Sequence, residues 1–362
     1  MNIKKIGLTA LATSLVASSA YAADVSVSGS AGFVFATKSG GATGGGATDH
    51  GKGFGVDNAL SFSASGEMDN GWSVSASTAL TDAAAVSSNN VTLTMGSLGS
   101  VFGGYGNGGQ AGNYDGIAGA YEEVDDGGQT LSSNLVGSQF DNGGIFYTAP
   151  AIDASGATVQ IHLGYTPKAN DVALAGGVTD GTAGYGSAKQ AGMTISTDLG
   201  LTVGVFAQTA DRESTAATVS DAFAGTMYAK YAMGPVSIGY LTSYSDYGTT
   251  SSAEAAIANK VVGTAAGIFE SEEYVIAFNV NDNLSVSYAK SEDTYDAQAG
   301  ASAGSTTSDA IADVSVDNKS IQAAYSLGSM SIKAYRQESS NRTYSSTAGS
   351  STKNEIALGL TF

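Results

Sequence analysis

Apolar and polar residues alternate along most of the chain with a period of two, which is the pattern of β-strands that have two different faces. In the stretch 24–35, Val25, Val27 and Phe33 fall on one face, and Ser26 and Ser28 fall on the other. Further segments with this alternation lie near residues 60–65, 72–80, 91–95, 159–165, 193–195, 203–205, 238–240, 274–280, 284–288, 321–325 and 356–362. The chain is therefore predicted to be all-β.

Short and long connections alternate strictly between these segments. Short turns are predicted at 69–70, 98–99, 150–156, 198–200, 234–235, 282–283 and 327–328. Longer loops rich in Gly, Ser, Thr, Ala and Asp are predicted at 39–56, 82–88, 107–138, 169–188, 213–221, 248–267, 294–313 and 341–352. Seven turns and eight loops join sixteen strands. An even number of strands with this asymmetry is typical of a transmembrane β-barrel, and it disfavours a soluble sandwich or solenoid. We predict a 16-stranded antiparallel transmembrane β-barrel.

The first residues have the features of a secretory signal peptide. Lys4 and Lys5 precede an apolar stretch at 6–16, and Ala20 and Ala22 form a small-x-small cleavage site. We expect residues 1–22 to be cleaved, after Ala22 or after Ala23, and residues 23–362 to form one barrel domain. The apolar stretch is too short to span a bilayer as a helix.

Composition excludes several functional classes. The chain has no Cys, two His, and 33 acidic against 15 basic residues. Because nucleic-acid-binding proteins present a basic surface, this balance argues against a nucleic-acid partner. A G-x-S-x-G match around Ser302 has no His after it, so it lacks the base that a nucleophilic serine requires. A G-x-G-x-x-G match at 104–109 has no βαβ context. We therefore do not expect an enzyme.

The last segment, NEIALGLTF, alternates to a terminal aromatic residue, Phe362, and the predicted mature chain opens with ADVSVSGSAGF. With the signal peptide and the sixteen segments, this pattern resembles the Gram-negative general diffusion porins, most of all the alphaproteobacterial (Rhodobacter-like) type. The resemblance implies a homotrimer in outer-membrane lipid, and Phe362 as a signal for the outer-membrane assembly machinery. It also implies a water-filled channel for passive diffusion of small hydrophilic solutes and ions. The alternative is a barrel without a channel that serves as a surface adhesin or structural protein.

The stretch 106–138 is long, rich in glycine and acidic. By strand count it is the third long loop, which in this family folds into the barrel and narrows the pore. The resemblance thus implies a cation-preferring constriction formed by Asp115, Glu122, Glu123, Asp125 and Asp126.

In the same family a basic wall faces the constriction loop. The matching positions here are Lys168, Lys230, Lys333 and Arg336, although Arg336 shares the parity of the lipid-facing Ile332. Glu122, Glu123, Asp125 and Asp126 offer oxygen ligands of the kind that Ca²⁺ prefers, and the alternative is a solvated acidic loop. We expect no other cofactor.

Residues on the predicted outer face indicate how the barrel meets its surroundings. Tyrosines near the segment ends are expected to form the aromatic girdles found at headgroup level: Tyr105, Tyr147, Tyr165, Tyr231, Tyr244 and Tyr288. Small outward residues in the first strands would allow subunits to approach closely: Gly29, Ala31, Ala64, Gly66 and Ala76.

Overall fold

The computed structural model describes residues 24–40, 51–80, 86–105, 109–114, 117, 119–124, 143–167, 185–212, 221–246, 268–296, 314–341 and 349–362. The strands are β1 (Asp24–Gly40), β2 (Gly51–Glu67), β3 (Ser73–Leu80), β4 (Val86–Thr94), β5 (Ser100–Tyr105), β6 (Ile145–Thr148), β7 (Ile152–Ala154), β8 (Ala157–Thr166), β9 (Tyr185–Thr197), β10 (Leu201–Arg212), β11 (Ala222–Met233), β12 (Val236–Asp246), β13 (Ile268–Asn281), β14 (Leu284–Asp296), β15 (Val314–Leu327), β16 (Met330–Ser340) and β17 (Ser350–Thr361). Two short 3-10 helices accompany them, η1 (Gly96–Leu98) and η2 (Ala111–Asn113). In the part of the chain that the structure describes, no helix is long and apolar enough to cross a membrane.

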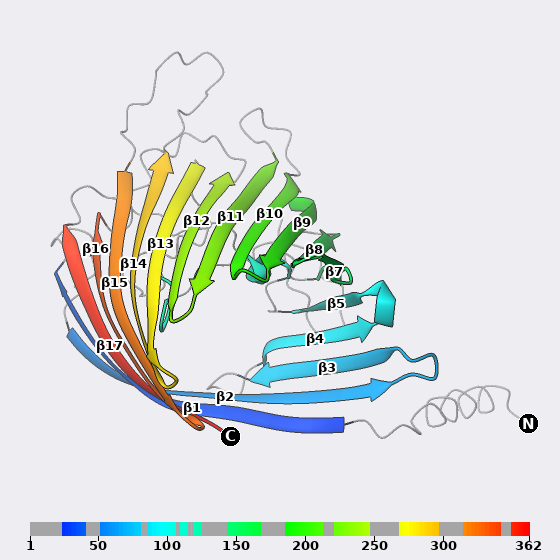
Figure 1. Cartoon of the computed structure of the whole chain (residues 1–362), viewed down its shortest axis with the longest axis horizontal. Helices are drawn as coiled ribbons and strands as arrows, with labels where there is room; N and C mark the ends of the chain where they lie inside the picture. Colours follow the sequence, from blue (N-terminus) through cyan, green and yellow to red (C-terminus); the bar gives the residue numbers. More distant parts are fainter. Residues whose placement is uncertain are drawn as a thin grey trace, which may run out of the picture.

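The strands form one closed antiparallel sheet. Each strand pairs with its neighbours in sequence, except that β6 and β7 both pair with β8, and β17 pairs with β1. Because β6 and β7 both pair with β8 and are separated only by residues 149–151, they are two parts of one barrel strand. The wall therefore has sixteen strands, as the alternation predicts. Figure 1 shows the strands in chain order round the wall, with β17 in red beside β1 in blue.

The barrel is apolar outside and polar inside. On β13, Tyr274 and Ile276 are about half exposed, whereas Ser271 and Glu273 on the opposite face are 5–6% exposed. Buried polar side chains recur at the inward positions of other strands, among them Gln190, Gln208, Ser243, Asn318, Gln322 and Gln337. An apolar outer band around a polar interior is the distribution expected of a barrel that stands in lipid and encloses water.

The predicted turn at 150–156 is wrong in its extent. The structure places β7 inside this stretch and confines the turn to Ser155 and Gly156. Pro150 has no N–H to donate to the ladder, so it interrupts the strand, which resumes at Ile152. The other short turns lie at or within one residue of their predicted positions. In one of them Gly200 has φ 87°, and a Cβ there would lie 2.3 Å from the Ala232 carbonyl oxygen.

The first long loop is shorter than predicted. β1 continues to Gly40 and β2 begins at Gly51, so residues 39–40 and 51–56 belong to the wall instead of a loop. Phe54 and Val56 point outward, 68% and 58% exposed, between glycines at the inward positions. Glycine at every second position makes this stretch glycine-rich, which favours the prediction of a loop. Its apolar residues nevertheless alternate as in a strand.

Phe362 lies at the seam where the barrel closes. Its backbone exchanges two hydrogen bonds with Gly29 of β1, from Gly29 N to Phe362 O (2.9 Å) and from Phe362 N to Gly29 O (3.0 Å). The aromatic ring lies over the same glycine, since a Cβ at Gly29 would lie 2.7 Å from ring carbon Cε2. Gly29 is therefore covered by Phe362, in contrast to the expectation that it offers a free small surface to another subunit.

Candidate functional site

The chain between β5 and β6 lies against the inward-facing side of the wall. Of the predicted loop, the structure describes residues 109–114, 117 and 119–124, which we call the inner segment. Gln110, Tyr114, Ile117 and Val124 belong to no strand, yet each is at most 1% exposed. Contacts of the inner segment extend from β6 and β8 at one end to β17 at the other, so the segment lies against the inner face of the wall.

Gln110 fixes the beginning of the inner segment. Its Nε2 donates to the carbonyl oxygen of Tyr147 (3.1 Å) and to Oγ1 of Thr148 (3.3 Å), both on β6. Its backbone N–H donates to Oε1 of Gln190 on β9 (3.4 Å). A fully buried amide with these partners loses little by leaving water, because its hydrogen-bonding groups are satisfied.

Tyr114 occupies a notch that glycine provides. A Cβ at Gly192 on β9 would lie 2.4 Å from the Tyr114 ring, so any larger residue there would displace the ring. The ring stacks on Phe206 of β10 with centroids 4.9 Å apart. Its hydroxyl shares a 2.6 Å hydrogen bond with Nδ1 of His162 on β8. Burial, followed by the charge of Tyr228, raises the pKa of Tyr114, so the phenol stays protonated.

The middle of the inner segment follows the wall from β12 to β15. Ile117 packs on Gly239 of β12, where a Cβ would lie 3.1 Å from the isoleucine. The backbone N–H of Ala120 donates to Oγ of Ser287 on β14 (2.7 Å). Gln322 of β15 then acts as a clamp: its Oε1 accepts from the N–H groups of Tyr121 (2.8 Å) and residue 122 (3.1 Å), and its Nε2 donates to the carbonyl of residue 122 (2.8 Å).

A cluster of two tyrosines, two lysines and one carboxylate holds the end of the inner segment. The Tyr121 hydroxyl donates to Glu355 Oε1 on β17 (2.9 Å), and the Tyr335 hydroxyl donates to Glu355 Oε2 (3.2 Å). Lys353 forms an ion pair with the same carboxylate (2.9 Å), and Lys333 Nζ lies 5.1 Å from the centroid of the Tyr121 ring. Burial, followed by the hydrogen bond to Glu355, raises the pKa of Tyr121. Beyond this cluster, Gln337 Nε2 donates to the carbonyl of Val124.

Two of the five predicted constriction acids lie in the described inner segment. Glu122 and Glu123 are partly buried where the segment meets β15. Asp115, Asp125 and Asp126 lie outside the described residues, as does Lys168.

The two predicted wall lysines that the structure describes, Lys230 and Lys333, do not stand on neighbouring strands. Lys230 and Lys333 both face inward, but they stand on β11 and β16 with β12–β15 between them. Lys230 lies 5.0 Å from the ring centroid of Tyr228, and Lys333 contacts the inner segment through Tyr121. Lys333 therefore lies beside the segment that it was expected to face.

The assignment of Arg336 to the pore wall is wrong. Its side chain is 58% exposed on the outer face, where it forms a 2.8 Å ion pair with Glu338. It occupies the same face of β16 as Ile332, because the strand is regular and no bulge reverses its parity.

The sequence prediction missed the residues that seat the inner segment. Gln110, Tyr114 and Tyr121 lie in a stretch without strand alternation, where no pattern distinguishes a seated side chain from a solvated one. On the wall, the glutamines Gln190, Gln322 and Gln337 carried a usable signal, since each is a long polar side chain at an inward strand position. The alternation does not predict that these glutamines bind the backbone of the inner segment.

No cluster of three or more His, Cys, Asp or Glu side chains suited to a metal occurs among the described residues. Since Asp125 and Asp126 lie outside them, the predicted Ca²⁺ site at Glu122, Glu123, Asp125 and Asp126 is neither supported nor contradicted and stays a prediction.

A closed sixteen-stranded barrel with a lipid-facing exterior and a polar interior, against whose wall the inner segment is seated, defines an outer-membrane barrel of the channel type. The chain belongs to the Gram-negative porin family, whose model matches residues 7–282. It is accordingly a protein of the bacterial outer membrane.

Solved structures agree with this assignment at the level of the fold. A porin refined at 1.8 Å resolution is 16% identical, with 94% of this chain and 100% of that chain covered and a TM-score of 0.60. The anion-selective porin from Comamonas acidovorans is 13% identical, with coverages of 94% and 100% and a TM-score of 0.61. OmpF of Salmonella typhi, solved as a complex with daunomycin, is 13% identical, with coverages of 93% and 97% and a TM-score of 0.62. No curated protein sequence matches the chain.

Proposed function

We propose that the protein is a water-filled channel for passive diffusion of small hydrophilic solutes and ions, with a preference for cations, and that the inner segment narrows its pore. The observation that supports this proposal is the path of the inner segment, which is hydrogen-bonded to the wall from β6 to β17 and therefore occupies part of the pore cross-section. The family and the fold are those of channels, and we propose no catalytic role.

The balance of charge inside the barrel supports cation preference. Among the strand positions whose side chains the structure describes, four lysines face inward, Lys38, Lys230, Lys333 and Lys353, and one of these is neutralised by Glu355. The same face carries seven acids: Asp24, Asp57, Glu67, Asp153, Glu273, Asp293 and Glu355. Glu122 and Glu123 add to this excess at the inner segment. A pore lined by excess negative charge concentrates cations and repels anions.

Conductance across a planar bilayer, with the reversal potential measured in a salt gradient, tests the proposal. A water-filled pore gives stable conductance, and a cation-preferring pore shifts the reversal potential toward the cation equilibrium value. Absence of conductance from a folded barrel would support a surface adhesin or structural protein instead. A shift of the reversal potential toward the anion equilibrium value would refute the acidic constriction but not the channel itself.

Neutralising Glu122, Glu123, Asp125 and Asp126 together is expected to weaken the preference for cations while the barrel still folds. The matched control removes two acids from the outer face of the wall, Asp317→Asn with Glu338→Gln, and should leave the reversal potential unchanged. If the fourfold variant keeps the wild-type reversal potential, these acids do not set selectivity. A Ca²⁺ titration on the same pair of variants tests the predicted calcium site, which would alter conductance only where the four carboxylates are present.

We further infer a homotrimer of the alphaproteobacterial (Rhodobacter-like) type. The outer face of β1–β3 supports the trimer, because small residues (Ala31, Ala64 and Ala76) lie there among exposed apolar ones. One of the similar structures is described as a trimer form. Phe362 is proposed as the residue that the assembly machinery recognises, and residues 1–22, which lie outside the described part, as a cleaved signal peptide. Mass measurement of the protein in detergent tests the trimer.

A further inference from the structure

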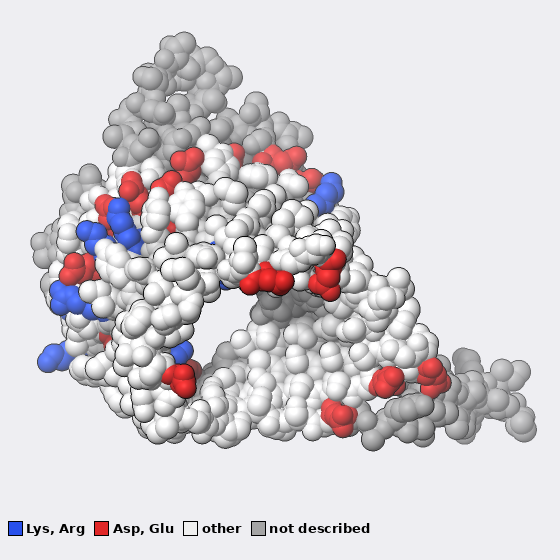
Figure 2. All heavy atoms as spheres, in the orientation of Figure 1, with Lys and Arg blue, Asp and Glu red and all other residues white. Residues whose placement is uncertain are grey.

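The open part of the barrel interior borders β1–β4. Inward side chains on the strands from β9 to β16 are covered, since Gln190 of β9, Ser243 of β12 and Ser320 of β15 are at most 8% exposed. In contrast, no residue of β1–β4 is buried, and the structure describes all four of these strands. Figure 2 shows a hollow in the middle of one face of the molecule, beside the largely uncharged surface where Figure 1 places β1–β4. Free space for a solute therefore lies along β1–β4.

Asp57 of β2 stands in a part of this inner face that is otherwise made of small side chains. Its register partner on β1 is Gly32, and the preceding inward position on β2 is Gly55. A Cβ built at Gly55 or at Gly53 would meet nothing within 4 Å, so the space above the backbone is open there. Neighbours of this size leave the Asp57 carboxylate uncovered, and the residue is exposed.

Three of the other inward acids are bound or buried. Glu355 accepts hydrogen bonds from two tyrosine hydroxyl groups and forms an ion pair with a lysine. Asp293 and Glu273 are only 1% and 5% exposed. The charge of such groups is compensated or kept away from free water, so an ion in the open part of the barrel is little affected by them.

The remaining inward acids differ from Asp57 in their position along the barrel. Asp24, Glu67 and Asp153 lie at the end that carries the short turns. Asp57 instead pairs with Gly32, near the middle of the 17-residue strand β1. Within the described part of the chain, its side chain forms no hydrogen bond or ion pair. An exposed carboxylate without a partner presents its full charge to a passing ion.

Asp57 also lies close to the inner segment. Burial is the main cause that raises the pKa of Tyr121, followed by the hydrogen bond to Glu355 and the charge of Glu355, and the charges of Glu122 and Asp57 contribute further. Because the effect of a charge in water fades over a short distance, Asp57 must stand near Tyr121 to act on it. The open space beside β2 is therefore bordered by Asp57 on the wall and by the inner segment.

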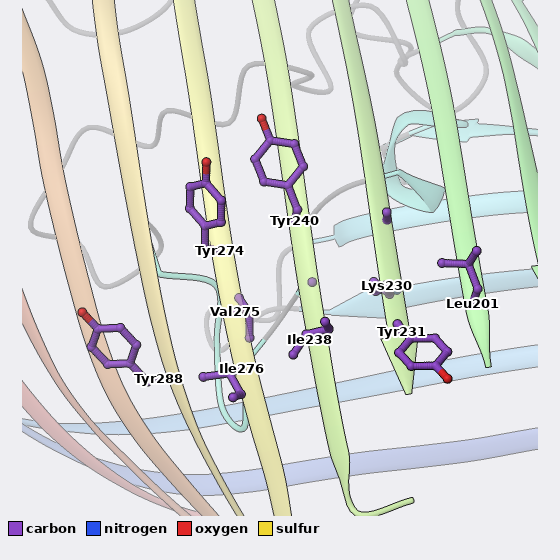
Figure 3. Close-up of a pocket in the computed structure, with 11 residues that line it drawn as sticks. Leu201, Lys230, Tyr231, Ile238, Tyr240, Tyr274, Val275, Ile276 and Tyr288 are labelled. Atoms are coloured by element: carbon purple, nitrogen blue, oxygen red, sulfur yellow. The ribbon is translucent and has the colours of Figure 1, made fainter. Parts of the chain in front are cut away.

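Two of the four inward lysines are remote from Asp57. Lys230 stands on β11, with seven strands between it and β2 in either direction round the wall when β6 and β7 count as one. Figure 3 shows Lys230 on β11 next to Tyr231. Lys38 lies six positions from Gly32 along β1, which is about 20 Å in an extended strand.

The other two inward lysines are engaged elsewhere. Lys353 forms its ion pair with Glu355, at 2.9 Å. Lys333 lies 5.1 Å from the centroid of the Tyr121 ring. Neither forms an ion pair with Asp57 among the described residues, so the charge of Asp57 is not cancelled by a direct partner.

We propose that Asp57 is the residue of the barrel wall that selects cations, by attracting a hydrated cation as it passes between β2 and the inner segment. This inference rests on the proposed channel function and assigns part of its selectivity to a position outside the acidic loop. The favoured solutes are small hydrophilic molecules with a net positive charge, such as inorganic cations and primary amines. Their attraction should depend on the charge at position 57 and should decrease as salt screens that charge.

The reversal potential of the channel in a twofold KCl gradient tests the proposal. A unit charge about 5 Å from an ion in water changes the local concentration of that ion roughly twofold at 0.1 M salt. Because the carboxylate attracts potassium and repels chloride, Asp57→Asn should lower the potassium-to-chloride permeability ratio about fourfold. Asp57→Glu keeps the charge and should keep the ratio. In gradients near 1 M salt, where the Debye length is about 3 Å, Asp57→Asn and wild type should become nearly equal.

Charge that is added after folding separates selectivity from folding. The chain contains no cysteine, so Asp57→Cys provides a single thiol. A thiol reagent that carries a sulfonate should restore the wild-type ratio, and one that carries a trimethylammonium group should lower the ratio below that of Asp57→Asn. Glu67→Gln is the matched control, because it removes an exposed inward acid at the turn end of the same strand, and it should leave the ratio unchanged.

Three results would overturn the role of Asp57 and leave the proposed channel intact. They are a wild-type permeability ratio for Asp57→Asn at 0.1 M salt, an equal decrease for Glu67→Gln, and equal effects of the two thiol reagents on Asp57→Cys. A wild-type pore without any preference for cations would instead refute the proposed cation preference, and this inference with it.

Discussion

Replacing Gly192 with alanine tests whether the inner segment is seated on β9 as the structure describes. The new methyl carbon would lie 2.4 Å from the Tyr114 ring, and ordinary carbon contacts begin near 3.4 Å. The ring must therefore move by about 1 Å. It cannot slide freely, because Phe206 stacks on one side and the hydroxyl is bound to His162 at 2.6 Å.

The cost of this displacement can be worked out from the contacts. Overpacking a filled site typically costs about 1–3 kcal/mol. Loss of the hydrogen bond between Tyr114 and His162 adds about 0.5–1.5 kcal/mol. The contacts that seat the inner segment should therefore weaken by about 1.5–4.5 kcal/mol, which raises the population of the unseated segment roughly 10- to 2,000-fold.

Thiol labelling measures that population. The chain contains no cysteine, so Ala111→Cys, at a position 3% exposed in η2, introduces a single buried reporter. In the Gly192→Ala background the reporter should react with a water-soluble thiol reagent at least about 10 times faster than in the wild-type background. Single-channel conductance should become noisier at the same time, because the segment would move within the pore.

Gly55→Ala is the matched control. Gly55 is also an inward-facing strand glycine, but a Cβ there would meet nothing within 4 Å. It should leave the labelling rate unchanged. Tyr114→Ala removes the same contact from the side of the segment and should reproduce the faster labelling without altering β9. Equal labelling rates in the Gly192→Ala and Gly55→Ala backgrounds, in barrels that have folded, would refute the seating of Tyr114.

Three further predictions concern the seat and the seam. Gly119→Cys with Ser287→Cys should form a disulfide, because a Cβ at Gly119 would lie 2.7 Å from the serine oxygen. Bilayer conductance should then be the same before and after reduction of the disulfide. A change in conductance would mean that the disulfide had pulled the inner segment out of place. Gly29→Val should slow barrel closure and lower the free energy of unfolding by about 1–3 kcal/mol, because the valine side chain would collide with the Phe362 ring, which lies 2.7 Å from the position of its Cβ. A heat-unfolding midpoint equal to that of the wild type would contradict this prediction. Because the pKa of Tyr121 is raised, its phenol should stay protonated, and its hydrogen bond to Glu355 intact, up to about pH 10, and this hydrogen bond should weaken only at higher pH. An ultraviolet difference titration that shows ionisation of Tyr121 near pH 10 would contradict this prediction.

The fold was largely predictable from the sequence because strand alternation and connection length are local properties. Apolar side chains at every second position identify the lipid-facing side of each strand, and alternating short and long connections give the strand number and the two ends of the barrel. The largest local errors lie at 150–156 and at 39–56, where a proline and a row of glycines obscure the alternation of wall strands. Four other predicted loops, 82–88, 169–188, 294–313 and 341–352, overlap a wall strand by three or four residues at one end. The side of the wall on which Arg336 lies was also readable, since its parity with Ile332 is confirmed and only its assignment to the pore was mistaken.

What the sequence by itself determined is therefore an antiparallel barrel with an acidic third connection. Only the tertiary structure decided which residues that connection meets. Tyr114 contacts Gly192, and Tyr121 bonds to Glu355, although several strands separate the members of each pair along the chain. No periodic pattern in the sequence predicts such pairs. They depend on the curvature that closes the wall and brings β9 and β17 within reach of one short segment. The polar clamp of Gln322 arises in the same way, from neighbours that the closed sheet creates.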